Sequence, residues 1–432
     1  MDAETAYFFR HALLRDVAYQ LQLPGERAKL HALAFELIEK LHGGRAPALP
    51  SLQGASPAPL EPHATDAVAA ELAEHLAAAL EGEWGAADQA RLNEARVLYL
   101  WRAAALHEAR YQGERAARLW LALARITGGL SRIHALSAAG GILRQRGRWR
   151  EAESHFLVAV EELARCHDRR YEAILKANLA GVCRDAGRWD EAIAGYVAAA
   201  TTFDELGLHH LRSVQLGNLA VLYQETGQAE RATAAFDDAV ASLRRSGQTR
   251  SLGVALGNLA SSLLARGQRD AAERTFDEAL AIHRQTGNRR FEGIVLGNLG
   301  LLYLENGNLQ KAAHALKRAI AIHRQLGNLR HEGIAIGYFA SLDERYGRHK
   351  QAQRRFEKAL ALLDEAGDMY FRAINQCDLA LLLVKSGALE RARQLWADGT
   401  ALLSRLKRTS DLQQLRSRMR ETCAKYGQAA LD

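Results

Sequence analysis

The sequence predicts an all-α fold, a right-handed superhelical solenoid built from helix-turn-helix units. Two observations lead to this prediction. A glycine recurs every forty residues, and all six prolines of the 432-residue chain lie at or before Pro62. A proline inside a helix costs about 3 kcal/mol. The absence of proline after Pro62 therefore allows long helices in the rest of the chain. The recurring glycines are Gly147, Gly187, Gly227, Gly267, Gly307, Gly347 and Gly387.

Apolar and small residues recur in register with these glycines. Alanine follows each glycine after five residues and a bulky apolar residue follows after nine, a spacing that places both on one helix face. The bulky residues are Phe156, Tyr196, Phe236, Phe276, Leu316, Phe356 and Trp396. A second apolar stripe precedes each glycine, for example Leu299 and Tyr303 before Gly307. Each unit is therefore predicted to be a helix pair, and stacked pairs bury both stripes.

This pattern resembles the tetratricopeptide repeat in its forty-residue form, with seven copies over residues 131–406. The resemblance implies stacked helix pairs whose first helices line a concave groove. Residues 65–130 are predicted to form a helical lead-in containing one degenerate copy, with Gly113 at its turn. Residues 407–432 are predicted to form a polar helix that caps the exposed end of the array.

The first residues carry a different set of short motifs. They are Phe9-Arg10-His11, Tyr19, Pro24, Glu26-Arg27 and Leu30-His31. Through them, residues 1–43 resemble the C-terminal end of the ATPase module of STAND-type signalling proteins. The chain has no G-x-x-x-x-G-K-[ST] loop to hold nucleotide phosphates, so we expect the nucleotide-binding part to be encoded separately, lost or upstream of the start. Residues 44–64 hold five of the six prolines and are predicted to be a linker.

Composition and residue spacing argue against a membrane protein and against a metal site. The net charge of +7 comes from arginines interspersed with acids, and the four cysteines show no C-x-x-C spacing. No apolar run is long enough to span a membrane, and we expect a cytoplasmic protein without cofactor or metal. His283 and His323 repeat at one register, but equivalent atoms of neighbouring units lie too far apart to share a zinc ion, so a surface position or packing between units is predicted for both.

Four successive units place an asparagine nine residues before the turn glycine. These candidate peptide-binding residues are Asn178, Asn218, Asn258 and Asn298. Three of them follow a glycine, and both glycine and asparagine are unfavourable inside a helix. Helix propensity therefore does not explain why the Gly-Asn pair recurs. An amide can donate to a peptide C=O and accept from a peptide N–H, which favours backbone contact in the groove. The alternative is hydrogen bonding between neighbouring helices.

Seven residues after the asparagine position, charged residues are expected to face the same groove. They are Glu225, Glu305, Arg345 and Lys385. Their sign changes along the array, which would orient an asymmetric partner. A solvated surface is the alternative explanation.

The predicted function is a non-catalytic scaffold that binds an extended protein segment, as the sensor or regulatory arm of a bacterial signal-transduction or transcription-regulatory system. Its partners would be that segment and a separately encoded ATPase or regulator. The alternative is a nucleic-acid-binding helical repeat, which needs a continuous basic stripe and steeply salt-dependent binding. The interspersed acids disfavour it, and no set of titrating residues indicates an enzyme.

Overall fold

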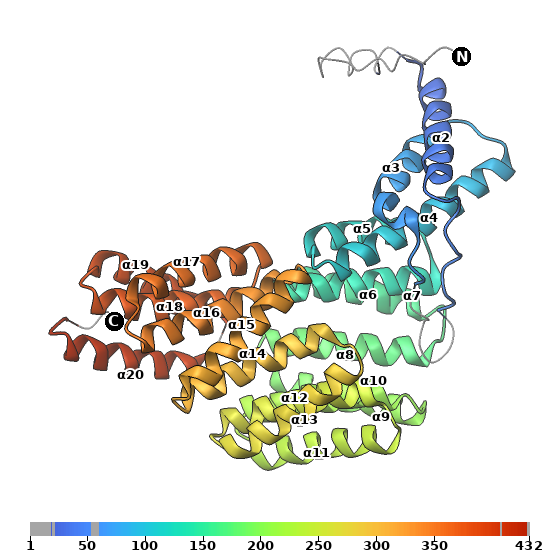
Figure 1. The fold of residues 1–432 in the computed structure, drawn as a ribbon. Helices are drawn as coiled ribbons and strands as arrows, with labels where there is room; N and C mark the ends of the chain where they lie inside the picture. Colours follow the sequence, from blue (N-terminus) through green and yellow to red (C-terminus); the bar gives the residue numbers. More distant parts are fainter. Residues whose placement is uncertain (1–18, 20–21, 53–59, 407, 430–432) are drawn as a thin grey trace. The chain divides into compact units, whose positions relative to one another are not determined.

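The computed structural model describes residues 19, 22–52, 60–406 and 408–429. All regular elements within these ranges are helices (Figure 1). They divide into two compact units, residues 1–136 and residues 137–432. The predicted all-helical fold is confirmed for this part of the chain.

The first unit packs four helices and a short 3-10 helix around one core. These are α2 (Pro24–Leu41), η1 (Ala64–Val68), α3 (Ala69–Ala79), α4 (Ala86–Ala109) and α5 (Gly113–Ile126). Phe35 of α2 and Tyr99 of α4 meet edge to face with ring centroids 6.1 Å apart. The buried Arg102 donates to Asp66 Oδ1 and to the Glu61 carbonyl, both at 2.6 Å, and so fixes the entry to α3.

Residues expected to form the remnant and the linker belong to this unit. Pro24 opens α2 at its first position, as the sequence suggests, whereas Phe9-Arg10-His11 lies outside the described residues. In the predicted linker, Ala46 and Leu52 are buried, and the Ala46 N–H donates to Tyr99 Oη at 3.3 Å. At these two residues the predicted linker is thus packed into the first unit, while Arg45, Pro47, Ala48 and Ser51 are exposed.

The second unit is a row of helices of nearly constant length. Helix α6 (Gly129–Gln145) leads into it from the first unit. The others are α7 (Trp149–Leu163), α8 (Arg169–Asp185), α9 (Trp189–Glu205), α10 (His209–Glu225), α11 (Ala229–Arg245), α12 (Thr249–Ala265), α13 (Arg269–Gln285), α14 (Arg289–Glu305), α15 (Leu309–Gln325), α16 (Leu329–Arg345), α17 (His349–Ala366), α18 (Met369–Lys385), α19 (Leu389–Arg405) and α20 (Thr409–Lys425). Consecutive helices pack against each other along the row, which makes the unit a solenoid.

From Gly187 to Gly387, a glycine with a positive φ follows each helix. These glycines recur every twenty residues, which is half the forty-residue period predicted from the sequence. At Gly307, φ is +75° and the following Asn308 N–H donates back to the Tyr303 carbonyl at 2.8 Å, which is the Schellman arrangement. The same positive φ occurs between units, at glycines outside the forty-residue series that predicted the fold. These are Gly207, Gly247, Gly287, Gly327 and Gly367. Glycine takes this conformation without the steric cost of a side chain.

The degenerate first copy uses different turn chemistry. Gly113 is the first residue of α5 rather than the turn residue, and the positive φ of +59° falls on Tyr111. At the turn between α7 and α8, His167 takes the glycine role with φ +51°. The chain therefore tolerates a strained non-glycine residue at two of its turns.

Within each pair, a small residue on the first helix receives the bulky residue of the second. The small positions are Gly140, Ala180, Ala220, Ala260, Gly300, Ala340 and Ala380, and all are buried. At Gly300 an added Cβ would lie 2.5 Å from Leu316 Cγ, which leaves no space for a methyl group. The two helices of a pair therefore cross closely at these positions.

The two repeated histidines are buried, so of the two predicted alternatives packing holds and a surface position does not. His283 and His323 are 0% and 1% exposed, and each faces a glycine on the first helix of its own pair, Gly253 or Gly293, where a Cβ would lie 2.7 Å from the imidazole Cε1. The His323 ring stacks on His331 with centroids 5.2 Å apart. Burial lowers the pKa of His323 to about 4, and the nearby Arg290 acts in the same direction.

Replacing either of two glycines of α14 by alanine is expected to change the free energy of unfolding, in opposite directions at the two positions. Gly300→Ala should lower the free energy of unfolding by about 1–3 kcal/mol, since the methyl group overlaps Leu316. Gly297→Ala should raise it by about 0.5–1 kcal/mol, because no atom lies within 4 Å of its Cβ position. Urea unfolding followed by circular dichroism measures both. Effects of the same sign would contradict the packing described for Gly300.

A second prediction concerns acid stability. The folded pKa of His323 lies below the unfolded value of 6.5, so the unfolded chain binds the proton first. The contribution of the neutral His323 to the free energy of unfolding is therefore complete above pH 6.5 and declines as the pH falls towards 4. His323→Leu copies Leu363, which faces Gly333 at the same register. From pH 7 to 5 the wild type should lose roughly 2 kcal/mol more unfolding free energy than this variant.

The matched control is His314→Leu, at an exposed position of the same helix. It should keep the wild-type dependence on pH when urea midpoints are compared at the two pH values. If His323→Leu also kept it, the buried imidazole would not be the group that titrates on unfolding.

Candidate functional site

The first helices of successive pairs lie side by side in the second unit. Helix α10 packs on α12, α12 on α14, α14 on α16, and α16 on α18. Residues forty positions apart therefore line up across these helices and α8, and we call this the first-helix surface. All eight predicted site residues belong to these helices, with the asparagines in the middle and the charged residues at the last position.

The four asparagines differ in what they contact. Asn298 Nδ2 donates to Ser261 Oγ on α12 at 3.1 Å, and Asn218 Nδ2 donates to Gln215 Oε1 of its own helix at 3.3 Å. Asn258 is exposed, and neither it nor Asn178 forms a hydrogen bond with another described residue. Bonding between neighbouring helices therefore accounts for Asn298 but leaves other amides of the row free for a partner.

The glycines at this register, Gly217, Gly257, Gly297 and Gly337, differ in how closely the neighbouring first helix approaches them. A Cβ at Gly217 would lie 3.8 Å from Asn258 Nδ2, and one at Gly337 would lie 2.2 Å from Asn375 Oδ1. At Gly297 the same position is open. Close packing thus explains why residue 337 is a glycine. At residue 297 the described residues leave space for a side chain, so packing does not explain the glycine there.

Charged residues at the helix ends form bonds from one unit to the next. The next-to-last residue of one first helix pairs with the last residue of the following one. The pairs are Arg144–Asp185 at 2.9 Å, Arg184–Glu225 at 3.0 Å, and Glu344–Lys385. Two of the predicted partner-binding charges, Glu225 and Lys385, are thus already used between units. The signal available in the sequence was opposite charge at a separation of forty-one residues.

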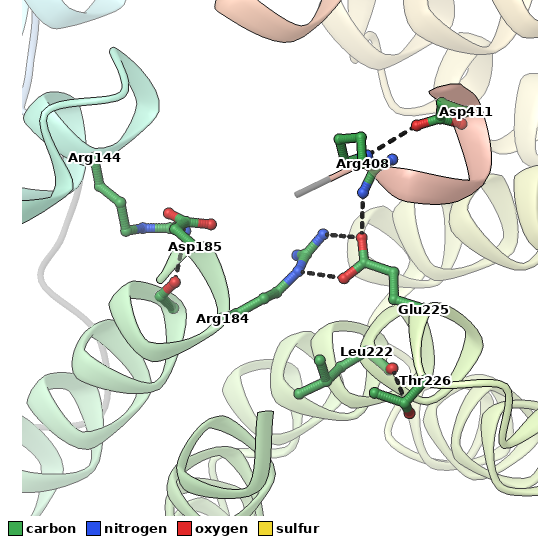
Figure 2. Close-up of polar contacts among 9 residues, drawn as sticks. Arg144, Arg184, Asp185, Leu222, Glu225, Thr226, Arg408 and Asp411 are labelled. Carbon is green, nitrogen blue, oxygen red and sulfur yellow. Dashed lines mark hydrogen bonds and ion pairs between the residues drawn. The ribbon is translucent and has the colours of Figure 1, made fainter. Parts of the chain in front are cut away.

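Glu225 has a second cationic partner from much later in the chain. Arg408 Nη1 donates to Glu225 Oε1 at 2.8 Å, the oxygen that also accepts from Arg184 Nη2 (Figure 2). Arg408 also donates to Asp411 Oδ2 at 3.0 Å and lies 4.6 Å from the centre of the Tyr370 ring. Burial disfavours the charged form of Glu225, but the arginines outweigh it and hold its pKa below the usual range.

The other two predicted charges are exposed. Glu305 and Arg345 end α14 and α16 and form no hydrogen bond or ion pair with another described residue. Partial burial raises the pKa of Glu305, which the charge of Arg269 only partly offsets. These two side chains are opposite in sign and lie on neighbouring helices.

The structure also has two hollows away from the predicted residues. One, of about 410 Å³, lies between the second helices α13 and α15, with Leu296 and Leu299 of α14 at its base. The other, of about 640 Å³, has the equivalent position between α17 and α19. None of the eight predicted residues lines either hollow. Among the described residues, no helix is long and apolar enough to cross a membrane.

Part of this chain matches a family model in sequence, and solved structures match it in fold. A tetratricopeptide repeat family model matches residues 171–245 and 251–325. A Rap protein complexed with Competence and Sporulation Factor is similar in structure, with 15% identity, a TM-score of 0.58, and coverage of 88% of this chain and 99% of that one. The apo form of the quorum sensor NprR from B. thuringiensis has 14% identity, a TM-score of 0.52, and coverage of 90% and 99%.

No curated protein matches the chain significantly in sequence. At these identities the two solved structures establish similarity of fold. Together with the helix pairs and glycine turns, the family match shows that residues 171–245 and 251–325 consist of tetratricopeptide repeats.

Proposed function

We propose that this protein is a non-catalytic scaffold that holds an extended protein segment on the first-helix surface. The observation that carries the proposal is the row of amides at one register, from Asn178 to Asn298, in which Asn258 is exposed. Packed helices lie about 8–10 Å apart and an extended chain advances about 3.3 Å per residue. One amide therefore meets roughly every third residue of a bound strand and can pair with its backbone.

The unpaired charges support a directional partner. Glu305 and Arg345 are exposed at the ends of adjacent first helices, so a segment that crosses them meets a negative and then a positive group. A partner with the opposite order of charges would be favoured in one orientation and disfavoured in the other. Lys385 would contribute only if its pair with Glu344 opened.

The wider role that we propose is the sensor or regulatory arm of a bacterial signalling or transcription-regulatory system in the cytoplasm. Residues 1–43 would be the end of a STAND-type ATPase module, with a separately encoded ATPase or regulator as partner. The fold of Rap and NprR supports a regulatory role, since NprR is a quorum sensor and the Rap protein was solved with Competence and Sporulation Factor. A reading frame beside this gene that encodes the nucleotide-binding part would support the ATPase link.

Loss of the amides should weaken segment binding. Peptides would be selected from a phage-displayed library on the full chain and their affinities measured by fluorescence anisotropy. Changing Asn218, Asn258 and Asn298 together to alanine should weaken binding at least about ten-fold, because each lost hydrogen bond contributes about 0.5–1.5 kcal/mol.

The matched control changes exposed residues of the second helices, Arg245→Ala and Lys317→Ala, and should keep the wild-type affinity. Equal affinity of the triple asparagine variant and the wild type would contradict the role of the amides. Titration with labelled double-stranded DNA and RNA tests the alternative function. Recovery of no peptide together with steeply salt-dependent nucleic-acid binding would favour that alternative.

A further inference from the structure

Two sets of contacts join parts of the second unit that are far apart in the sequence. Arg408 reaches Glu225 across 183 residues. Near the start of the unit, Arg146 Nη1 donates to the Ala366 carbonyl at 3.4 Å, and Met369 packs on Gly147, where an added Cβ would lie 2.1 Å from its methyl carbon. The array therefore curves until later turns touch earlier ones.

Arg408 lies in a site built from three helices. Glu225 comes from the end of α10, Tyr370 from the first turn of α18 and Asp411 from the first turn of α20. Two carboxylates and an aromatic face are groups that bind a guanidinium through charge-assisted hydrogen bonds and cation–π contact. These contacts raise the pKa of Arg408 although burial opposes this, so the side chain is held as a cation.

The contact can open without leaving Glu225 unpaired. Arg184 donates to both oxygens of that carboxylate at 3.0 Å, as part of the bonding between units seen also at Arg144–Asp185 (Figure 2). The side chains of Glu225 and Arg408 are 20% and 34% exposed, so water can solvate both after separation. Breaking a fully buried ion pair leaves a charge without a partner or water, which is strongly destabilising. The Arg408–Glu225 pair avoids this cost because water reaches both side chains.

The location of Glu225 links this contact to segment binding. Glu225 ends a first helix at the register of Glu305 and Arg345, so an extended segment lying across the first helices passes near it. A guanidinium on that segment could use the same carboxylates and ring that hold Arg408. The two cations would then compete for one site.

We propose that Arg408 closes one turn of the array by occupying a guanidinium site formed by Glu225, Tyr370 and Asp411, and that an arginine on the bound segment displaces it. This inference rests on the proposed function, because the displacing group belongs to the segment. Closure lowers the apparent affinity for that segment by the fraction of molecules that are open. Loss of Arg408 therefore opens the turn and strengthens binding of arginine-containing segments.

The first experiment measures closure without any ligand. Spin labels are placed at Glu230→Cys and Gln413→Cys, two exposed positions, in the full chain with Cys166→Ser. Pulsed electron double resonance then gives the distance between α11 and α20. Arg408→Gln and about 0.5 M NaCl should each lengthen and broaden the distance distribution. Arg416→Gln, on the exposed surface of the same helix, should leave it unchanged.

The second experiment measures competition. Phage-displayed peptides are selected on the full chain and on Arg408→Gln, and affinities are compared for arginine-containing peptides and their citrulline analogues. Arg408→Gln should bind the arginine peptides about ten-fold more tightly than the wild type, as expected if about one molecule in ten is open. Glu225→Gln and citrulline should each remove this gain.

The outcomes separate this inference from the proposed function. An unchanged distance distribution in Arg408→Gln overturns the closure. Peptides bound equally by the wild type and Arg408→Gln overturn the displacement but leave the scaffold standing. Failure of both proteins to bind any peptide overturns the proposed function, while the distance measurement still decides whether Arg408 closes the turn.

Discussion

The close crossing of the two helices in each pair is the constraint on which the rest of the second unit depends. Gly300 has no space for even a methyl group beside Leu316, and the equivalent positions hold only glycine or alanine. This contact fixes how each second helix lies on its first helix. Repetition at a fixed length then fixes the register between pairs, because three-residue turns leave little freedom. The row of amides and the row of charges both follow from that register.

The same register serves stability and recognition with different side chains. Buried histidines stack on rings of the following unit, as His323 does on His331, and Arg184–Glu225 type pairs join neighbouring units again at the helix ends. Asn298 contributes to this joining through Ser261, whereas Asn258 at the same register is exposed. A repeat array can therefore change from structural to binding chemistry by changing one residue per unit without altering the backbone.

The sequence predicted the helix pairs, the turn glycines at forty-residue spacing and the apolar stripes that the pairs bury, because each leaves a periodic signal. It did not predict the role of Tyr111 as a turn residue, since a positive φ at a non-glycine residue has no sequence signature. The contact of Arg408 with Glu225 also could not be predicted, because it depends on the accumulated curvature of many units. The use of Lys385 and Glu225 between units was visible only as opposite charge at a forty-one-residue step. The proposed binding roles of the eight residues remain predictions.

The ladder of ion pairs has a gap in the middle of the array. At the junctions ending in Ala265, Glu305 and Arg345, the preceding first helices carry Gln224, Leu264 and Leu304, which cannot form this ion pair. Ion pairs elsewhere join the central units instead, such as Arg284–Glu292 and Arg324–Glu332, in which the carboxylates are buried. Dissolved salt screens exposed charges more than buried ones, so added electrolyte acts on each junction according to how deeply its carboxylate lies.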